Sequence, residues 1–489
     1  MGRPTAIDHR NLTGRRECMN RETHLSAAFS PSSVAIAGVG PITAGKWYLD
    51  SLLSSGFKGK IYPIHPSGGE MSGLKTYASI KDIPDSVDYV ICCIPARFVP
   101  QLIKECAERR VKAVSLFTSG FSETGSDEGR RLEAEIVRVA RVSGTRLIGP
   151  NCMGVYNPRS GLSFVTDFPR EAGGVALVCQ SGGNTIYFVR LAAERGIRFS
   201  KVISYGNACD VDESDMFEYL TEDSETDLVA AYIEGVKDGR RFHQALARLA
   251  SAKPVVILKG GSTDYGARTA ASHTGSMSGS DRVWTSLLDQ NGAIRVLTLE
   301  ELVDMAVTFR FMPLPRGRRA AMVGGGGGAS VLATDACAAN GFSLPAISQP
   351  LSEKIRGFLD TDAGLILSNP IELNMFPDAT YNVAKNLLAD EGFDLMLANC
   401  VFGQHPWPVF DVWFDLFYDT ILKTHDEIDK PVAVVLDSDL TGQQSRLAAL
   451  RQRYCAAGIP VYYSMSSACK ALDRFMDYHQ KRRRPNEAP

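Results

Sequence analysis

The chain has 489 residues, which at roughly 150 residues per domain predicts about three domains. Its 53 basic and 55 acidic residues leave a formal net charge of −2, so no global field favours nucleic acid or an anionic membrane. No apolar run approaches the roughly 20 residues of a membrane helix, and the 11 cysteines include no C-x-x-C pair. We therefore expect a soluble, cytoplasmic protein with reduced thiols, no metal site, no nucleic-acid partner and no membrane contact.

Three apolar segments run directly into glycine clusters, at residues 34–40, 175–183 and 320–328, and their starts are about one domain length apart. Between them, short apolar runs alternate with helix-length segments, which indicates parallel sheets with helices on both faces. Further strands are predicted at 60–64, 89–94, 113–117, 145–148, 201–204, 228–233, 254–258, 395–399 and 431–436.

Stretches rich in proline and glycine predict where the domains begin and end. We expect a disordered or variable extension over 1–30, α/β domains over 31–157, 158–313 and 314–475, and a basic tail over 476–489. The acidic residues of the first segment argue against a transit peptide. A start of translation at Met19 is an alternative to a start at Met1.

Glycines after the first strand let backbone amides approach a phosphate. Gly38 and Gly40 are not followed by the third glycine of the dinucleotide fingerprint, which argues against hydride transfer. Gly40 to Lys46 has the spacing of a nucleotide-binding loop, but Trp47 stands where the magnesium-binding hydroxyl belongs, which argues against an ATPase. Two hypotheses remain: a loop that accepts a pyrophosphate, with Lys46 as a point charge, or glycines that only permit a tight turn.

Three features of the second domain suggest anion chemistry. Small residues from Ser181 to Gly183 stand where a helix begins, and free amides there can hold a dianion. His273 lies among small and hydroxylic residues, which keeps it accessible, although a satisfied loop histidine is the plainer hypothesis. Glu234 ends an apolar strand, where its carboxylate can fix the tautomer of an imidazole.

Eight motifs occur in one order along the chain: VAIAG (34–38), GFKGKIYP (56–63), TSGFSE (118–123), GPNC (149–152), QSGG (180–183), YIEG (232–235), SHTG (272–275) and NPIEL (369–373). Over residues 28–475 they resemble the α-type part of the NDP-forming acyl-CoA synthetases, in the succinyl-CoA synthetase superfamily. The resemblance implies an α/β fold with a Rossmann-like CoA-binding domain and two flavodoxin-like doubly wound parallel-sheet domains. The ATP-grasp nucleotide domain of that family finds no counterpart among the motifs.

The resemblance also implies the roles of individual residues. His273 would be the phosphohistidine, Glu234 would orient it, and Ser181, Gly182 and Gly183 would bind the phosphate. The residues that would bind CoA are Gly38, Lys46, Pro66, Pro95, Thr118, Ser119 and Asn151. The implied enzyme is an acid–CoA ligase acting on an acyl-CoA or carboxylic acid, with ATP, ADP and Mg²⁺ bound only through a separate ATP-grasp β-type subunit. A homo-oligomer is the alternative assembly.

Several residues depart from the family or leave alternatives open. Tyr48 stands near a family glycine and His65 stands where an asparagine is common, which puts CoA affinity in doubt. A non-catalytic or repurposed CoA-binding module is therefore a second hypothesis, and a scaffold with unrelated chemistry on a hydrophobic or aryl substrate is a third. Trp47, Tyr48 and Phe188 hint at a bulky or aryl acyl group. Cys152 is either a core thiol or a nucleophile paired with His273. The glycines at 324–328 offer a second phosphate site or only a turn.

Overall fold

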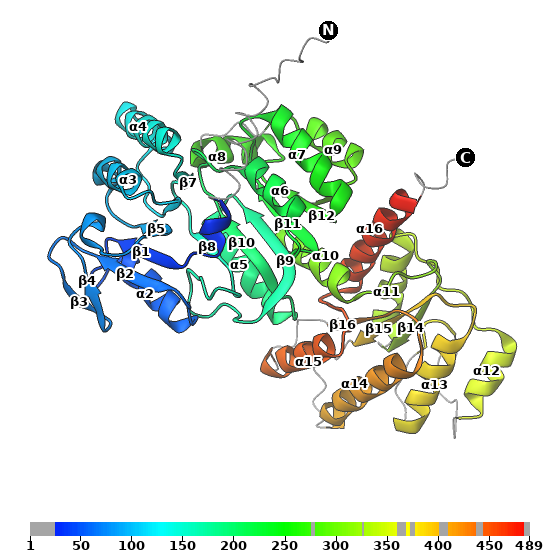
Figure 1. Ribbon diagram of the computed structural model, residues 1–489. Coiled ribbons are helices and arrows are strands. Elements are labelled where there is room, and N and C mark those ends of the chain that lie inside the picture. The colour runs from blue at the N-terminus through cyan, green and yellow to red at the C-terminus, as the bar shows by residue number, and fades with distance from the viewer. Residues whose placement is uncertain are drawn as a thin grey trace, which may run out of the picture. The chain divides into compact units, whose positions relative to one another are not determined.

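The computed structural model describes residues 25–274, 279–324, 327–358, 368–371, 377–400, 409–436 and 444–483. The chain divides into two compact units, of which the first comprises residues 1–190 and 198–299 and the second comprises residues 191–197 and 300–489. The first unit contains two mainly parallel sheets and the second contains one (Figure 1). None of the helices within the described ranges is long and apolar enough to cross a membrane.

The first sheet is built from β1 (Ser33–Ala37), β2 (Lys60–Ile64), β5 (Tyr89–Cys92), β6 (Ala113–Leu116) and β7 (Arg146–Ile148). All five strands are parallel, in the order β2-β1-β5-β6-β7. Strands β1, β5, β6 and β7 are buried along their whole length, which is typical of parallel strands covered on both faces. One face carries α2 (Ala44–Ser54), and the other carries α3 (Val99–Glu108) and α4 (Asp127–Ser143) (Figure 1).

Short elements occupy the loops of this sheet. A hairpin follows β2 and consists of β3 (Gly69–Met71) and β4 (Leu74–Thr76). Three one-turn 3-10 helices are η1 (Ile80–Asp82), η2 (Ala96–Phe98) and η3 (Ser122–Thr124). The last two follow the carboxyl ends of β5 and β6, so they lie at the edge where a parallel sheet binds its ligand.

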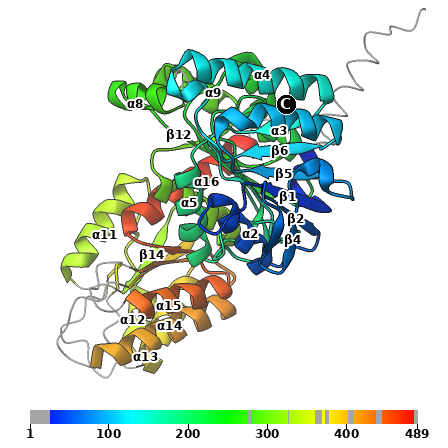
Figure 2. The ribbon, with the colours of Figure 1, turned by 90° about the vertical axis from the view of Figure 1, so that its left-hand side faces the viewer.

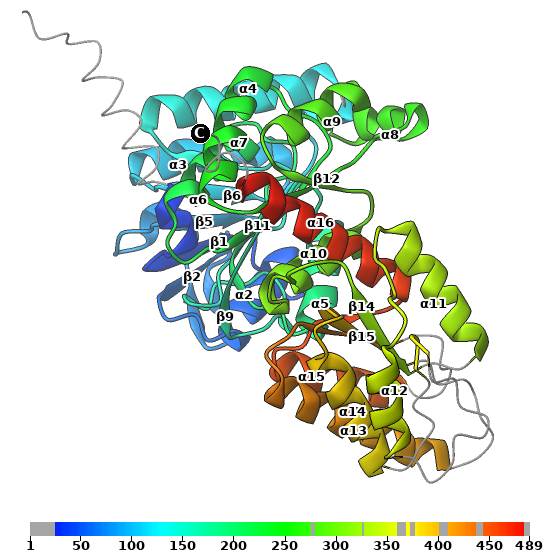
Figure 3. The same cartoon turned by 90° about the vertical axis from the view of Figure 1, so that its right-hand side faces the viewer.

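The second sheet contains β8 (Gly154–Tyr156), β9 (Ala172–Cys179), β10 (Phe199–Ser204), β11 (Leu228–Ile233), β12 (Val255–Lys259) and β13 (Ile294–Val296). Its order is β13-β12-β11-β9-β10-β8, and all strands are parallel except β8, which runs antiparallel to β10. The β8 strand precedes the predicted boundary after residue 157 and yet pairs with this sheet. The helices are α5 (Gly182–Glu194), α6 (Glu213–Glu222), α7 (Gly239–Ala252), α8 (Asp264–Thr274) and α9 (Asp281–Gln290), with α6 and α7 side by side (Figure 3).

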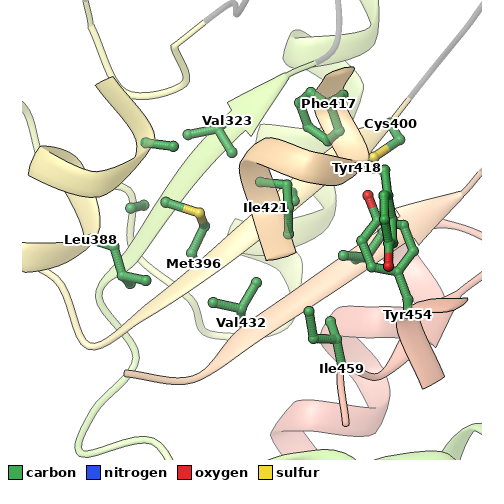
Figure 4. Packing of buried hydrophobic residues seen from close by; sticks show 14 of the residues in the cluster. Val323, Leu388, Met396, Cys400, Phe417, Tyr418, Ile421, Val432, Tyr454 and Ile459 are labelled. Carbon is green, nitrogen blue, oxygen red and sulfur yellow. The ribbon is translucent and has the colours of Figure 1, made fainter. Parts of the chain in front are cut away.

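The second unit begins with α10 (Leu299–Phe311) and contains the four parallel strands β14 (Ala320–Gly324), β15 (Leu395–Cys400), β16 (Val432–Leu436) and β17 (Val461–Tyr462), in that order. Its other helices are α11 (Gly327–Ala339), α12 (Gln349–Arg356), α13 (Pro377–Ala389), α14 (Val409–Glu427), α15 (Gln444–Ala456) and α16 (Met465–Arg483). Helix α14 lies beside α13 (Figure 2). Figure 4 shows the core of this unit, where Met396 and Val432 of the sheet face Leu388 of α13 and Ile421 of α14.

Strand order reverses once in each sheet of the first unit. From β1 the chain moves outward to β2 and then returns to the other side at β5, and from β9 it moves to β10 and returns at β11. The two loops at such a point part to opposite faces and leave a crevice beyond the carboxyl ends of the strands, where α/β proteins bind ligands. The fold therefore predicts one ligand site between β1 and β5 and another between β9 and β11.

A buried cluster of charges joins these two sheets. Arg146 of β7, which is 4% exposed, pairs with Asp210 at 2.9 Å and with Asp215 at 3.1 Å. Asp210 follows β10 and Asp215 lies on α6, so both carboxylates come from the second sheet's part of the unit. Burial by itself raises the pKa of Asp215, but the charges of Arg146 and Arg241 outweigh burial and hold this pKa below its ordinary value.

Replacing Arg146 should destabilise the first unit strongly. Arg146→Ala leaves two carboxylates without their buried partner, which costs about 3–5 kcal/mol in the free energy of unfolding. Urea unfolding at pH 7 measures this loss. The stability that comes from a lowered carboxyl pKa is present above the unfolded value of about 4 and is lost as pH falls below it, so the difference between variant and wild type should shrink in acid.

A surface pair provides the control for this measurement. Arg131 of α4 pairs with Glu128 and is 64% exposed, so Arg131→Ala should cost no more than about 1 kcal/mol. Equal losses for the two variants would show that the buried cluster does not hold the sheets together.

Candidate active site

The loops at the carboxyl edge of the first sheet carry six of the seven predicted CoA-binding residues. Gly38 follows β1, Pro66 follows β2, Pro95 follows β5, Thr118 and Ser119 follow β6, and Asn151 follows β7. Because the strands are parallel, these residues come to one edge of one sheet. The seventh, Lys46, lies in the first turn of α2, directly after the loop of Gly38. Their contact with CoA stays a prediction.

Gly38 lies at the reversal of the first sheet and must be a glycine for two reasons. Its φ of +95° is unfavourable for residues with a side chain, and a Cβ there would lie 2.9 Å from the carbonyl oxygen of Cys93. Thr43 closes the loop, because its hydroxyl donates to the carbonyl of Gly38 at 2.9 Å and accepts from the amide of Gly40 at 2.9 Å. The amides of Gly38 and Val39 donate to the carbonyl of Ile64 at 3.1 Å and 3.2 Å, so the backbone at this point is fixed and its amides already have acceptors.

Lys46 is less free than the sequence predicts. Its ammonium group lies 2.5 Å from the carboxylate of Asp50, one turn further along α2. A phosphate at this loop would have to share Lys46 with that carboxylate or displace it. The i, i+4 spacing of the two residues is the signal that could have predicted the pair.

Thr118 and Asn151 hold the loops together. The buried hydroxyl of Thr118 donates to the carbonyl of Ile94 at 2.7 Å, and the amide of Asn151 donates to the carbonyl of Thr118 at 3.0 Å. These contacts tie the loops after β5, β6 and β7 to one another. Ser119, Pro66 and Pro95 are the members of the set that lie exposed at the edge.

Gln180 and Glu234 meet at the reversal of the second sheet, where β9 and β11 end. The side-chain oxygen of Gln180 accepts from the amide of Glu234 at 2.8 Å and lies 3.4 Å from that of Gly235. Glu234 is 6% exposed, and the hydroxyl of Tyr232 donates to its carboxylate at 3.1 Å. The role of Gln180 was not predicted from the sequence. Its place directly after a buried strand and before two glycines is the signal.

Helix α5 begins at this same point. Ser181 immediately precedes the helix, and its hydroxyl accepts from the amide of Asn184 at 3.3 Å. A Cβ at Gly183 would meet no atom within 4 Å, so the approach to the helix N-terminus is open. The first amides of a helix have no partner within it, and the helix dipole favours an anion there. Ser181, Gly182 and Gly183 thus stand where a phosphate could bind.

His273 lies in the last turn of α8, one residue before the helix ends. Its side chain is outside the described residues, so its predicted contact with Glu234 stays a prediction. Helix α8 contacts η3, the turn that follows the loop of Thr118 and Ser119. The backbone that carries His273 therefore belongs to a helix that touches the ligand edge of the first sheet.

Lys259 adds a buried cation that was not predicted from the sequence. It ends β12 beside β11, and its ammonium group donates to the carbonyls of Glu234, at 2.8 Å, and Gly260. Burial lowers the pKa of Lys259 to about 8, against the charges of Glu234 and Asp281, which raise it. Lys259 ends an apolar strand, as Ile233 does just before Glu234 on β11, and this position in the sequence is the signal that could have predicted a polar group at the ligand edge.

Comparison with known proteins places this arrangement in a family. A CoA binding domain model matches residues 32–158, and a model described as the succinyl-CoA ligase like flavodoxin domain matches residues 172–309. The α subunit of ADP-forming acetate–CoA ligase II from Pyrococcus furiosus is 39% identical over 345 residues, covering 70% of this chain and 75% of that one. The chain belongs to the ADP-forming acid–CoA ligase family.

Other members of the acid–CoA ligase family match over nearly the whole chain. The dinucleotide forming acetyl-coenzyme A synthetase 1 of Ca. Korarchaeum cryptofilum, solved in complex with phosphate and ADP, has a TM-score of 0.80 at 30% identity, covering 95% of this chain and 99% of that one. A trans-feruloyl-CoA synthase, FCS1, from an unknown prokaryotic organism is 29% identical over 485 residues, covering 96% of this chain and 66% of that one. The predicted family and α/β fold are confirmed.

Two of the three aromatic residues that hint at a bulky or aryl acyl group, Tyr48 and Phe188, are buried in the core. Tyr48 is 1% exposed and donates its hydroxyl to the carbonyl of Met153 at 2.9 Å, with its ring against Phe117. Phe188 is fully buried beside Phe199 in the core of the second sheet. Helix periodicity turns both rings inward, and Trp47 alone of the three is partly exposed. Tyr48 and Phe188 are therefore core residues, and neither supports the hint of a bulky or aryl acyl group.

Cys152 has the surroundings of a core thiol. Its Sγ lies 3.4 Å from the carbonyl oxygen of Ile148 and 3.5 Å from that of Leu116, and both are backbone acceptors. Burial raises the pKa of Cys152 to about 12, so the thiolate that a nucleophile requires is scarce at neutral pH. The structure favours packing over catalysis for this residue.

Cys152→Ala should therefore leave the ligase activity within about threefold of wild type, whereas loss of a catalytic nucleophile costs several orders of magnitude. The substitution should lower the free energy of unfolding by about 1–3 kcal/mol, the range for a core truncation. Steady-state kinetics and urea unfolding measure the two effects. Rapid alkylation of Cys152 in the native protein at pH 7, together with loss of activity, would contradict the assignment.

Proposed function

We propose that the chain is the α-type component of an acid–CoA ligase that interconverts acyl-CoA, phosphate and ADP with carboxylate, CoA and ATP. Membership of the family supports the overall reaction. One observation carries the assignment of the site: the segment after Asn151 leads directly to the start of α5. The amide of Met153 donates to the hydroxyl of Ser204 at 3.1 Å, and a Cβ at Gly182 would lie 2.9 Å from the side chain of Met153.

CoA lies along the carboxyl edge of the first sheet in this proposal. A phosphate group of CoA lies against the loop of Gly38, and Ser119, Pro66 and Pro95 present the exposed surface. Thr118 and Asn151 act by fixing the shape of the loops, since their polar groups bind backbone atoms. Lys46 contributes positive charge to the ligand when its ammonium group leaves Asp50 and turns towards the phosphate.

In the first step inorganic phosphate attacks the thioester carbonyl. A carbon–oxygen bond forms, the carbon–sulfur bond breaks, and the thiolate of CoA leaves and takes a proton from solvent. The amides of Gly182 and Gly183 hold the phosphate, with the dipole of α5 opposing its charge. Such a step depends chiefly on position and charge stabilisation, which backbone amides and small residues supply.

In the second step an imidazole nitrogen of His273 attacks the phosphorus of the acyl phosphate. A nitrogen–phosphorus bond forms, the bond from phosphorus to the acyl oxygen breaks, and the carboxylate leaves. The carboxylate of Glu234 accepts a hydrogen bond from the N–H of the ring and so fixes the tautomer of the imidazole. Gln180 holds the backbone amide of Glu234, and the hydroxyl of Tyr232 donates to its carboxylate, which supports this role.

The last step passes the phosphoryl group to ADP, which we assign, with its Mg²⁺, to an ATP-grasp β-type subunit. The relative from Pyrococcus furiosus is itself named as a subunit α, which supports a partner chain. We assign the acyl group to a monocarboxylic acid, because relatives that match over most of this chain are named for acetate and for trans-feruloyl-CoA, whereas the relative named for succinate matches over 38% of it. The partly exposed Trp47 is the aromatic residue that remains available to an acyl group.

The phosphoryl relay predicts a labelled chain in the absence of nucleotide. Labelled phosphate with acetyl-CoA or feruloyl-CoA should place an acid-labile, base-stable label on the wild-type chain, because thioester cleavage and histidine phosphorylation both precede contact with ADP. His273→Ala should abolish the label. Glu234→Gln should slow labelling by about 10- to 1000-fold, as expected when an orienting electrostatic partner is lost.

Glu222→Gln is the matched control, because Glu222 lies on the surface of α6 with its side chain 80% exposed and should label at the wild-type rate. Calorimetry with CoA separates binding from chemistry. A wild-type chain that binds CoA but takes up no label from any acyl-CoA would remove the relay and favour the hypothesis of a CoA-binding module.

A further inference from the structure

The loop between β6 and α4 is held in shape by the carboxylate of Glu123. One oxygen of Glu123 accepts from the amide of Gly120 at 2.6 Å and from that of Phe121 at 3.1 Å. Gly120 has a φ of +105°, which the loop needs in order to fold back over the carboxylate. Thr118 and Ser119 lie at the start of this loop, so the position of Glu123 governs the part of the edge assigned to acyl-CoA.

The second oxygen of Glu123 reaches across to the other sheet. It accepts from the side-chain amide of Asn207 at 2.8 Å, and Asn207 belongs to the loop that follows β10. Asn207 is itself fixed: its backbone amide donates to the carbonyl of Pro150 at 3.0 Å, and the ammonium group of Lys237 donates to its carbonyl at 2.9 Å. One carboxylate thus joins the ligand loop of the first sheet to a rigid point of the second.

The side-chain oxygen of Asn207 indicates why an asparagine occupies this position. This oxygen is buried and has no hydrogen-bond partner among the described residues, a condition that costs about 1–3 kcal/mol. Turning the amide around would place that oxygen against the carboxylate of Glu123, which is worse. An asparagine at this buried position leaves its side-chain oxygen without a partner in the described part of the chain. Its presence is explained if the NH2 group of the same amide is needed to donate to Glu123.

The same loop also touches the helix of the predicted phosphohistidine. Glu123 is part of η3, and η3 contacts α8, the helix that carries His273. Glu123 therefore belongs to a turn that contacts elements of both sheets' parts of the unit.

We propose that Glu123 is a positioning residue for attack of phosphate on the thioester, and that it acts through its bond to Asn207. This inference rests on the proposed function, because it concerns the distance between a thioester on the first sheet and a phosphate on the second. Reacting atoms must come to about 3–3.5 Å, and a misplacement of 1 Å costs about 100-fold in rate. Cleavage of the acyl phosphate by His273 takes place within the second sheet's part and does not depend on this link.

Asn207→Asp tests the link selectively. Glu123 can still accept from the amides of Gly120 and Phe121, but its second oxygen now faces another carboxylate, and rotation of the new side chain does not relieve the repulsion. Labelling from acyl-CoA and phosphate should slow by about 100-fold. Labelling from acetyl phosphate, which bypasses thioester attack, should stay within about threefold of wild type, as should the Kd for CoA.

A second substitution should rescue the first. In the double variant Glu123→Gln/Asn207→Asp the new amide can donate to the new carboxylate, so the bond returns with its direction reversed. Labelling from acyl-CoA should recover by at least about tenfold over Asn207→Asp alone, which a general loss of stability does not predict.

Glu133→Gln is the matched control. Glu133 of α4 accepts from the hydroxyl of Ser122 at 2.6 Å, so it holds the same loop but makes its contact within the first sheet's part. It should change labelling from the two donors equally, by about threefold at most. Equal slowing from acyl-CoA and acetyl phosphate in Asn207→Asp, or no rescue in the double variant, would overturn the inference. A wild-type chain labelled by neither donor would instead overturn the proposed function and the inference together.

Discussion

The candidate active site depends on one hydrogen-bonded contact, between the side chain of Gln180 and the amides that follow β11. The strands β9 and β11 pair along their length, and the ladder is extended once more where the amide of Gln180 donates to the carbonyl of Tyr232 at 3.0 Å. Beyond that point the two segments part to opposite faces. The side-chain oxygen of Gln180 accepts from the next amide, that of Glu234, and fixes this residue beside the start of α5.

The neighbouring strand completes the electrostatic setting. Lys259 brings an ammonium group to the carbonyl of Glu234, so three adjacent strands, β9, β11 and β12, each contribute one polar side chain at the same edge. Lys259 is 4% exposed, and burial lowers its pKa to about 8. Charges in such a setting interact more strongly than they do at an open surface, and a dianionic phosphate gains most from nearby amides and cations.

The sequence was sufficient for features that depend on local pattern. Apolar runs that end in glycine predict both the parallel strands and the edge at which Gly38, Ser181 and Glu234 lie, because parallel strands must share one ligand edge. Contacts between distant segments were not predictable in this way. The bond from Glu123 to Asn207 joins loops 84 residues apart. The inward turn of Tyr48 and Phe188 depends on which helix face meets the sheet, and a single aromatic residue does not indicate that face.

The phosphoryl relay is tested most directly by tracing the bridging oxygen of the acyl phosphate. The chain should be mixed with acyl-CoA and phosphate labelled with ¹⁸O in all four positions, in ordinary water and without nucleotide, and the released acid analysed by mass spectrometry. If phosphate attacks the thioester and His273 then takes the phosphoryl group, each molecule of acid carries one ¹⁸O, since the bridging oxygen leaves with the carboxylate. Acid that carries no ¹⁸O would mean that water cleaves the thioester, and would contradict the phosphoryl relay.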